Sequence, residues 1–422
     1  MYSRPPHSAK RPWWLLATLV LINISAIAEP IRLGLNYPST GRYKEQGIAQ
    51  AQGAMLAVEE INAKGGVLGR PLELLTANSA SDPVKAVANV NNLADQGVAM
   101  LFGGASSDVA IAAGKEAARH NLIYFGTLTY ANETTGAEGH RFMFREPYSA
   151  WMAAKAIGSW MNKQLAGKKV YYITANYSWG NSTEASLRHF TQTDDTRQHG
   201  VTKTPFPKPR QTDLEQAIND AVKAGAEVLM LVQFGEDLAS ALHMVQNRGL
   251  NRTMTIVAPS LTLDIARSAG AVSMEGVIGA IPWSWNVPFE KDYPAGKQFV
   301  TAYETRYGHY PSSSAASAYS IVYQFSDAVT RSGSLDSNKL IEALEGHQYT
   351  GLKDTQTWRA FDHQNVQTVY VVRGRERSKV MADKHKEDFF EILSSLSGDE
   401  AAPTRSEWEE QRRAAGKPLT LQ

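Results

Sequence analysis

Residues 31–70 read IRLGLNYPSTGRYKEQGIAQAQGAMLAVEEINAKGGVLGR and contain the pattern that decides the fold. The short apolar run at 31–35 predicts a strand, and the proline, serine, threonine and glycine that follow predict a loop. Beyond the loop, apolar residues recur at steps of three and four, which predicts a helix over 47–63. The four that would share its buried face are Ala51, Met55, Val58 and Ile61. Gly65 and Gly66 can adopt the positive φ that ends such a helix.

The same alternation of short apolar runs and helical patterns continues along the chain. Further strands are expected at 72–77, 100–103, 123–126, 170–174, 228–232 and 255–258, and further helices at 84–96, 109–120, 150–165, 181–192, 211–224 and 237–248. Continuous apolar strands that alternate with helices imply parallel sheets with helices on both faces. The sequence therefore predicts an α/β architecture, and its length allows two domains.

This pattern resembles one family, the extracytoplasmic solute-binding proteins of type I fold that serve amino-acid and amide importers, typified by leucine/isoleucine/valine-binding proteins. The matching words are the strand with the P-x-T-G loop at 38–41, GAMLAVEEINAKGGVLGR at 53–70 and MLFGGASSDVAIAA at 100–113. With the order of elements, the resemblance extends over about residues 31–372.

The resemblance implies two Rossmann-like lobes with parallel sheets, joined by a three-strand hinge. The chain is then expected to cross between lobes near residues 144, 279 and 356. Lobe 1 would comprise 31–144 plus 280–356, and lobe 2 would comprise 145–279 plus 357–395. The polar segment 396–422 is expected to pack on the surface or to stay mobile.

Residues 1–28 have the pattern of a secretory signal peptide. Arg4, Lys10 and Arg11 precede an apolar run at 13–24, and Ala26-Ile27-Ala28 is an A-x-A cleavage site. A membrane anchor is the alternative, but a spanning helix needs about 20 apolar residues. We therefore expect cleavage before Glu29 and a periplasmic location.

The remainder of the chain is nearly neutral and contains no cysteine. Residues 1–28 hold three of the 43 basic residues and none of the 42 acidic ones, so the rest carries a formal charge of −2. Nucleic acids and anionic membranes require basic patches, so binding to either is not expected. Without cysteine there is no disulfide, thiol catalyst or lipid-carrying cysteine. By the resemblance, a freely soluble periplasmic monomer is expected.

Two turns in the first half are candidates for holding a ligand. Ser106 and Ser107 follow a strand and precede a helix, where hydroxyls and free backbone N–H groups can bind an anion. The resemblance implies that this turn holds the ligand's carboxylate, whereas a simple helix cap is the alternative. The turn after the next strand supplies Leu128, Thr129 and Tyr130. In the family a threonine or serine hydroxyl binds there, and an exposed aromatic turn is the alternative.

The second half of the chain contains aromatic residues that follow strands, and one turn that differs from the family pattern. Tyr177 and Trp179 follow one strand and Phe234 follows the next, so these rings could close over a ligand or cover the core. Amino-acid binders of the family usually place an acidic residue in the turn at 258–261 to pair the ligand's ammonium. Here the turn carries Ser260, and Asp264 is expected to lie on a helix and to point away.

Signals of catalysis and of metal binding are weak. The chain has no G-x-S-x-G, H-E-x-x-H, Walker loop or G-x-G-x-x-G, and its ten histidines lack metal-ligand spacing. No cofactor is expected. We predict a binding protein that closes around a small amino acid, amide or carboxylate and delivers it to the permease of an ABC importer. The alternatives are a ligand sensor for a membrane receptor, which neighbouring genes would distinguish, and a secreted α/β enzyme, which turnover of a bound ligand would reveal.

Overall fold

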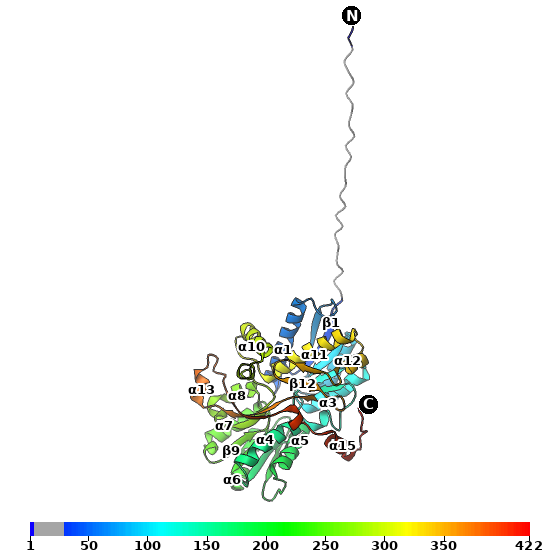
Figure 1. Ribbon diagram of the computed structural model, residues 1–422. Coiled ribbons are helices and arrows are strands. Elements are labelled where there is room, and N and C mark those ends of the chain that lie inside the picture. Colours follow the sequence, from blue (N-terminus) through cyan, green and yellow to red (C-terminus); the bar gives the residue numbers. More distant parts are fainter. Residues whose placement is uncertain (4–28) are drawn as a thin grey trace.

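The computed structural model describes residues 1–3 and 29–422, so the signal peptide expected at 1–28 lies almost entirely outside the described residues. Figure 1 shows two lobes, with β1 and α1 in the upper one and α4 to α7 in the lower one. Each lobe is built on a sheet with helices on both faces, which confirms the expected α/β class. No described helix is long and apolar enough to cross a membrane.

The first sheet contains five parallel strands in the order β2-β1-β3-β4-β5. Their bounds are β2 (Leu72–Asn78), β1 (Ile31–Tyr37), β3 (Met100–Gly103), β4 (Tyr124–Gly126) and β5 (Met143–Arg145). The helices of this lobe are α1 (Lys44–Ala63), α2 (Pro83–Asp95), α3 (Ser107–Arg119), α9 (Val287–Glu290), α10 (Pro294–Tyr307), α11 (Ser313–Ser332) and α12 (Ser337–Leu344), with the 3-10 turn η1 (Asn132–Thr134). A small antiparallel sheet consists of β11 (Gln348–Thr350), β12 (Thr355–Trp358) and β13 (Asn365–Val366).

The second sheet contains seven strands in the order β15-β14-β10-β9-β8-β6-β7. Their bounds are β15 (Phe390–Leu396), β14 (Val369–Gly374), β10 (Ile278–Ile281), β9 (Thr255–Ala258), β8 (Val228–Val232), β6 (Val170–Ala175) and β7 (Val201–Thr204). The accompanying helices are α4 (Ala150–Gln164), α5 (Ser178–Thr191), α6 (Gln211–Lys223), α7 (Glu236–Asn247), α8 (Leu263–Met274) and α13 (Arg377–Ala382), with the 3-10 turn η2 (Leu250–Arg252). The sheet is mixed rather than wholly parallel, because β14 runs antiparallel to β10 and to β15.

The buried face of helix α1 differs from the one that its apolar spacing predicts. Val58 and Ile61 are buried as expected, but Met55 is 42% exposed and Ala51 is only partly buried. The reason is that α11 packs along α1 at Gly53, where an added Cβ would lie 2.1 Å from Ala315 O. Small residues therefore define a second contact face, which hydrophobic spacing alone does not reveal.

Three connections join the lobes, at residues 146–149, 282–286 and 367–368. The first lies between β5 and α4, and the second lies between β10 and α9. The third comes later than expected, since residues 357–366 lie with the first lobe and not with the second. There Trp358 packs against Phe125 and Phe144, with ring centroids 5.7 and 5.6 Å apart. Trp358 and the bridge between Arg145 and Gln364 therefore hold this segment on lobe 1.

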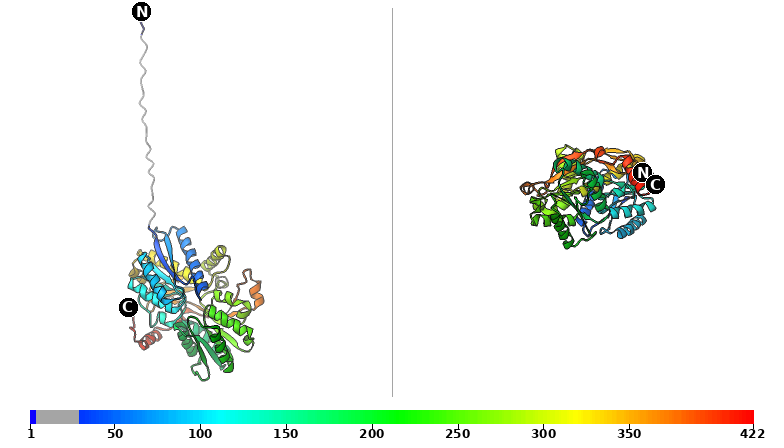
Figure 2. Two further views of the ribbon diagram at one scale, coloured as in Figure 1. Left: turned by 180° about the vertical axis from the view of Figure 1, so that it is seen from behind. Right: turned by 90° about the horizontal axis from the view of Figure 1, so that it is seen from below.

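The segment after β15 contains α14 (Gly398–Ala401), which packs against α4 of the second lobe, and α15 (Arg405–Ala414), which packs on the first lobe. Trp408 is 2% exposed, and its Nε1 donates to Thr135 O at 2.8 Å. Arg412 adds a hydrogen bond to Gly136 O at 2.6 Å. Figure 2 shows α15 beside the cyan elements of this lobe. The polar C-terminal segment is therefore packed on the protein. The buried indole of Trp408 and the guanidinium of Arg412 attach α15 to lobe 1.

Candidate functional site

The loops at the carboxyl ends of both sheets meet between the lobes, where open α/β sheets bind ligands. Five residues in these loops or in the first turn of the following helix form an interlobe aromatic cluster, namely Tyr43, Tyr130, Tyr177, Trp179 and Phe234. Phe234 lies at its centre, with ring centroids 5.6 Å from Tyr43, 6.0 Å from Tyr130 and 5.9 Å from Trp179. All five side chains are buried. The first two come from lobe 1 and the other three from lobe 2, so the cluster exists only while the lobes are closed.

Ser106 and Ser107 occupy the start of α3 and are 2% and 1% exposed. Ser106 is the N-cap of α3, and its Oγ accepts a hydrogen bond from Val109 N at 3.3 Å. Ser107 Oγ accepts one from Ala131 N at 3.0 Å, which ties this turn to the loop after β4. Both hydroxyls therefore serve as acceptors toward the backbone. A hydroxyl that accepts a hydrogen bond retains its own proton for donation.

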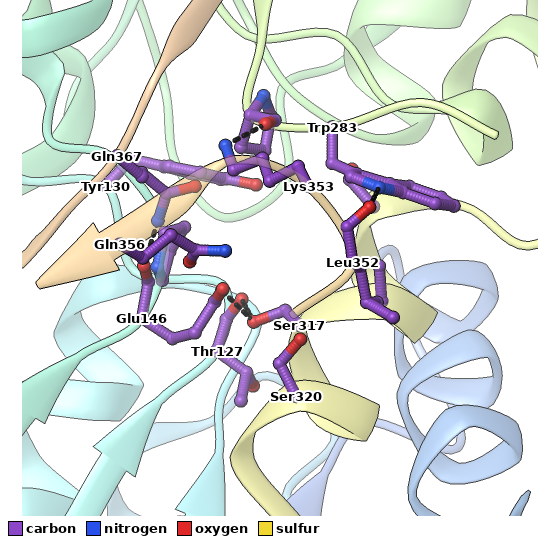
Figure 3. Close-up of a pocket in the computed structure, with 14 residues that line it drawn as sticks. Thr127, Tyr130, Glu146, Trp283, Ser317, Ser320, Leu352, Lys353, Gln356 and Gln367 are labelled. Carbon is purple, nitrogen blue, oxygen red and sulfur yellow. Dashed lines mark hydrogen bonds between the residues drawn. The ribbon is translucent and has the colours of Figure 1, made fainter. Parts of the chain in front are cut away.

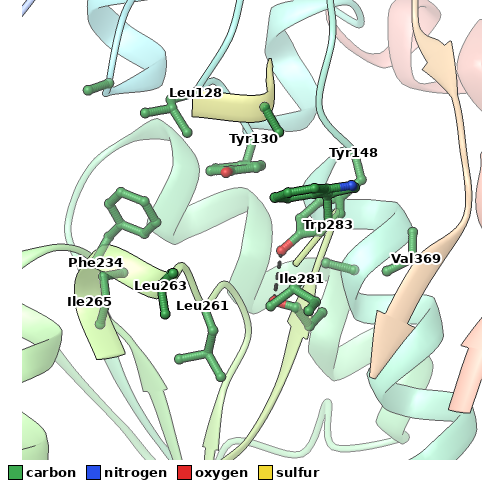
Figure 4. Packing of buried hydrophobic residues seen from close by; sticks show 14 of the residues in the cluster. Leu128, Tyr130, Tyr148, Phe234, Leu261, Leu263, Ile265, Ile281, Trp283 and Val369 are labelled. Atoms are coloured by element: carbon green, nitrogen blue, oxygen red, sulfur yellow. Dashed lines mark hydrogen bonds between the residues drawn. The ribbon is translucent and has the colours of Figure 1, made fainter. Parts of the chain in front are cut away.

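The loop after β4 places its three predicted residues in different surroundings. Tyr130 joins the aromatic cluster and also packs against Tyr148, at 5.2 Å between centroids. Leu128 is buried close to that cluster, as Figure 4 shows. The Thr129 hydroxyl instead pairs with the Thr134 hydroxyl at 2.6 Å, within the same loop. The Thr129 hydroxyl therefore stabilises the conformation of this loop.

The turn after β9 has no free carboxylate at the positions that the sequence singles out. Ser260 Oγ lies 3.4 Å from the hydroxyl of Tyr148, which donates to Ala280 O. Asp264 lies in the first turn of α8, as expected, but it does not point away, because its carboxylate accepts a hydrogen bond from Ser314 of lobe 1 at 3.2 Å. Its other oxygen pairs with Arg267 at 3.2 Å. Burial raises the pKa of Asp264, and the neighbouring Arg267 opposes that rise.

Two aromatic residues of this site were not predicted from the sequence. Tyr43 follows the loop after β1, and its ring lies so close to Gly235 that a Cβ there would be 2.7 Å from Cδ1. Its place after the carboxyl end of a strand was a usable signal. Phe206 stacks on Tyr177 with centroids 3.8 Å apart, but it follows the edge strand β7 and no local pattern marks it. Only the tertiary structure brings it to the cluster.

Several buried polar atoms near the cluster lack a hydrogen-bond partner among the described residues. Trp179 Nε1 is a buried donor without an acceptor, although the residue is only 2% exposed. The hydroxyls of Ser312 and Ser313, at the start of α11, are in the same condition. Buried donors normally have a hydrogen-bond partner. These unpaired donors are therefore candidates to donate a hydrogen bond to an oxygen atom of a ligand.

Hydrogen bonds and an ion pair also join the two lobes around the aromatic cluster. The Arg42 guanidinium forms an ion pair with Asp237 across the interlobe boundary. Burial raises the pKa of Asp237 to about 6, although Arg42 acts in the opposite direction. At η1, Asn132 Nδ2 donates to Ser186 Oγ of α5 at 2.9 Å. On the opposite side, Arg267 donates to Tyr310 O at 2.6 Å. These contacts stabilise the closed arrangement.

The three interlobe connections converge on a small buried cavity of about 20 Å³, shown in Figure 3. Lys353 Nζ donates to Pro282 O at 2.6 Å and to Thr368 O at 2.9 Å, which links the second connection to the third. Gln367 donates to Glu146 O and so links the third connection to the first. Burial lowers the pKa of Lys353 to about 8 and raises the pKa of Glu146. The hinge is therefore held by buried polar groups of the connections together with Lys353, which precedes β12 of lobe 1.

Within residues 1–3 and 29–422, no group of three or more histidine or acidic side chains is placed to hold a metal ion. The site is instead a closed aromatic cluster with hydroxyl and indole donors at its edges. Such a surface suits binding of a small organic molecule with at least one acceptor oxygen.

Comparisons with known proteins agree with this geometry. A family model described as periplasmic binding protein matches residues 30–379. A Leu/Ile/Val-binding protein homolog from Brucella melitensis is 24% identical over 393 residues, which cover 89% of this chain and 91% of that relative. A periplasmic binding protein from Burkholderia mallei superposes with a TM-score of 0.81 at 22% identity, over 90% of this chain and 98% of that one.

Two further solved structures share the fold and contain ligands. A solute binding protein of an ABC transporter from Rhodopseudomonas palustris, in complex with 3,4-dihydroxybenzoic acid, superposes with a TM-score of 0.74 at 18% identity, over 87% of this chain and 98% of that one. A branched-chain amino acid transporter substrate binding protein from Streptococcus pneumoniae, in complex with isoleucine, has a TM-score of 0.74 at 20% identity, over 87% and 99%. Because the family model spans most of its length, the chain belongs to the periplasmic binding protein family, with the type I fold and with relatives named as Leu/Ile/Val-binding proteins.

Proposed function

We propose that this protein captures a small organic ligand by closing its two lobes and delivers it to an ABC importer in the inner membrane. The observation that carries this proposal is the interlobe aromatic cluster, since rings from both lobes bury one another only in the closed state. A ligand that occupies this place stabilises the closed form through its contacts with both lobes. The importer then recognises the closed form.

The ligand contacts lobe 1 first and lobe 2 after closure, because the donors of the site belong to different lobes. Ser106 and Ser107 belong to lobe 1 and retain hydroxyl protons, so they orient an anionic or carbonyl oxygen first. Closure then brings Tyr177, Trp179 and Phe234 over the remainder of the ligand, and the unpaired Trp179 Nε1 offers a further donor. Binding involves no covalent step, and the protein acts as a carrier and not as an enzyme.

For the ligand we propose a carboxylate or an amide without an α-ammonium group. An ammonium in a buried site needs a carboxylate partner, because an unpaired buried charge is costly. Ser260 cannot provide one, and Asp264 is already bound to Arg267 and Ser314. A protein of the same fold holds 3,4-dihydroxybenzoic acid, while another holds isoleucine, so the fold accommodates both ligand classes.

One carboxylate could oppose this preference. Asp108 lies in the first turn of α3, and its charge acts on the buried hydroxyls of Tyr43 and Tyr177. If Asp108 pairs with an ammonium, amino acids would bind despite Ser260, and Asp108→Asn would abolish that binding. The variant therefore separates the two ligand classes.

The test is a thermal-shift screen with matched ligands, followed by calorimetry. Leucine is compared with its deaminated analogue 4-methylpentanoate and with the corresponding amide, and benzoate represents the aromatic acids. We expect the acids or amides to bind more tightly than leucine, isoleucine and valine. Submicromolar binding of the branched-chain amino acids without a response to the deaminated analogues would contradict the proposed ligand class.

The serine turn has its own test. Replacing Ser106 and Ser107 by alanine removes two hydroxyl donors to a charged group, each worth about 1.5–3 kcal/mol, so affinity should fall at least about tenfold. The loss of the Ser106 cap should lower unfolding stability by only about 1 kcal/mol. An unchanged dissociation constant would restrict both serines to backbone capping.

We also propose that the protein acts in the periplasm after removal of residues 1–28. N-terminal sequencing of protein from the periplasmic fraction is expected to begin at Glu29. A sequence that begins at Met1, or retention in the membrane fraction, would contradict export by cleavage.

A further inference from the structure

A second concave surface lies on lobe 1, apart from the interlobe cluster. It is a groove with a volume of about 740 Å³ between the C-terminal part of α1, α10, α11 and the β11 turn. None of the five interlobe aromatic residues lines it. Figure 1 shows α1, α10 and α11, which line this groove, in the upper lobe. A separate volume of this size is in the range of small-molecule sites.

Tyrosines form one wall of the groove and converge on a single carboxylate. Tyr319 and Tyr323, on successive turns of α11, have ring centroids 4.8 Å apart. Both hydroxyls donate to the same oxygen of Glu60, Oε2, at 2.5 and 2.7 Å. Tyr349 lines the groove from the opposite strand. Aromatic faces beside a carboxylate form an environment that favours a cation.

The charge of Glu60 is not neutralised within the described part of the chain. No ion pair involves Glu60, and its Oε1 has no hydrogen-bond partner among the described residues. Asp327, the other carboxylate of the groove, is already paired with Arg331 at 2.6 Å. Glu60 is therefore the group that can still accept a positive charge.

The molecule itself contains a cation on this wall. Lys64 Nζ lies 5.7 Å from the centroid of the Tyr323 ring, at the mouth of the groove. Lys64 is exposed, so its side chain can leave the ring for solvent at little cost. The ring face is thus suited to an ammonium group, and a ligand cation could replace the lysine.

We propose that this groove binds a small organic cation, in which an ammonium lies against Tyr323 beside Glu60 and an apolar body extends toward Tyr349. Trimethylammonium groups match such a site, because their charge is spread over methyl groups that are weakly hydrated. The site is independent of ligand capture between the lobes.

The probe is choline, and its control is the neutral isostere 3,3-dimethylbutan-1-ol, which has the same shape without the charge. Titration by calorimetry and by protein NMR should show saturable binding of choline, with shifts confined to α1, α11 and β11. The neutral alcohol should bind at least about fivefold more weakly, as expected for one exposed cation–π contact together with a carboxylate.

Two matched variants locate the site. Glu60→Gln keeps an oxygen acceptor for both tyrosine hydroxyls but removes the charge, and choline affinity should fall at least about fivefold. Glu59→Gln is the control on the same helix, since Glu59 pairs with Arg306 and does not line the groove. Melting temperatures without ligand verify that both variants fold.

Specific results would overturn the proposal. They are choline binding that does not saturate, equal affinity for choline and the neutral alcohol, and a Glu60→Gln variant that binds choline as the natural protein does. Binding that is abolished by alanine at Ser106 and Ser107, and not at Glu60, would place the cation between the lobes instead and would equally refute the groove.

Discussion

At the scale of single residues, burial changes the chemistry of groups that the sequence cannot tell apart. Ten histidines are spread along the chain, and none stands out by spacing. In the structure, burial lowers the pKa of His140 to about 4, and the neighbouring His363 and Lys115 act in the same direction. His140 Nδ1 also lacks a hydrogen-bond partner among the described residues. Between about pH 4 and 6.5, His140 is therefore neutral in the folded protein, whereas a histidine in an unfolded chain would be charged.

This difference predicts a pH dependence of stability. An unfolded histidine has a pKa of about 6.5, so between about pH 6.5 and 4 the unfolded chain binds a proton that the folded protein excludes. The stability contributed by His140 is present above pH 6.5 and is lost as the pH falls toward 4. In His140→Gln, the decrease of unfolding free energy between pH 7 and 4.5 should be smaller by about 2 kcal/mol, as measured by urea denaturation.

The control is His120→Gln, because His120 is exposed at the end of α3. Its pH dependence should match that of the natural protein. If His140→Gln retains the full slope, other groups account for the pH dependence, and the burial of His140 carries no weight in it.

At the scale of elements, the ends of helices and strands decide how closely the lobes approach. Gly235 precedes α7 with φ 59° and ψ −135°, a conformation that disfavours other residues. It lies against Tyr43, which precedes α1 of the opposite lobe. The absence of a side chain at Gly235 therefore permits both the turn and the interlobe contact.

We expect Gly235→Ala to weaken ligand binding at least about tenfold, because the new Cβ would lie 2.7 Å from a Tyr43 ring that is itself buried. Gly225→Ala is the control, since Gly225 also has a positive φ, of 68°, but nothing lies within 4 Å of its added Cβ. Both variants should lose some stability, about 1 kcal/mol for the backbone strain. Equal ligand affinities in the two variants, measured by calorimetry, would show that Tyr43 moves aside freely.

The C-terminal helix α15 depends on one side chain. Trp408 packs on Phe361 with ring centroids 5.3 Å apart and donates to Thr135 O. Trp408→Ala should lower unfolding stability by about 3–5 kcal/mol or release the segment after β15, with ligand affinity unchanged. Limited proteolysis and urea denaturation measure the two outcomes.

Arg413→Ala provides the comparison, because Arg413 is exposed and pairs only with Glu409 of the same helix in the described part of the chain. Its effect should stay within about 0.5 kcal/mol. If Trp408→Ala is equally mild and resists protease, the docking of α15 rests on its polar contacts, chiefly those of Arg412.

At the scale of the whole molecule, closure is a balance between contacts across the interlobe boundary and the flexibility of three connections. The aromatic cluster, the Arg42 ion pair with Asp237 and the Arg267 contacts favour the closed form. Each is formed by residues far apart in sequence, and each would be lost on opening. Contacts of a ligand with both lobes also stabilise the closed form.

We therefore expect ligand to reduce the radius of gyration in solution scattering and to change tryptophan fluorescence through Trp179, while the mass stays that of one chain. The scattering change should be smaller for Arg42→Ala, in which Asp237 remains buried without its partner. Scattering profiles that are identical with and without saturating ligand would contradict a closing clamp.

The sequence by itself determined the local elements and the family. The apolar run at 31–35, the loop with Pro38 and Gly41 and the helix that follows depend on interactions between near neighbours, and the structure contains all of them. The aromatic character of Tyr130, Trp179 and Phe234 was also readable, since each follows a strand end.

Only the tertiary structure decided which of these groups face one another. Phe206 joins Tyr177 from an edge strand, Trp358 holds its strand in lobe 1, and Asp264 turns to Ser314 of the other lobe. Met55 is exposed although it shares the predicted apolar spacing, because the buried face of α1 is the one on which α11 packs at Gly53. Such contacts join segments far apart in the chain, and their free energy depends on burial and geometry that no local pattern encodes.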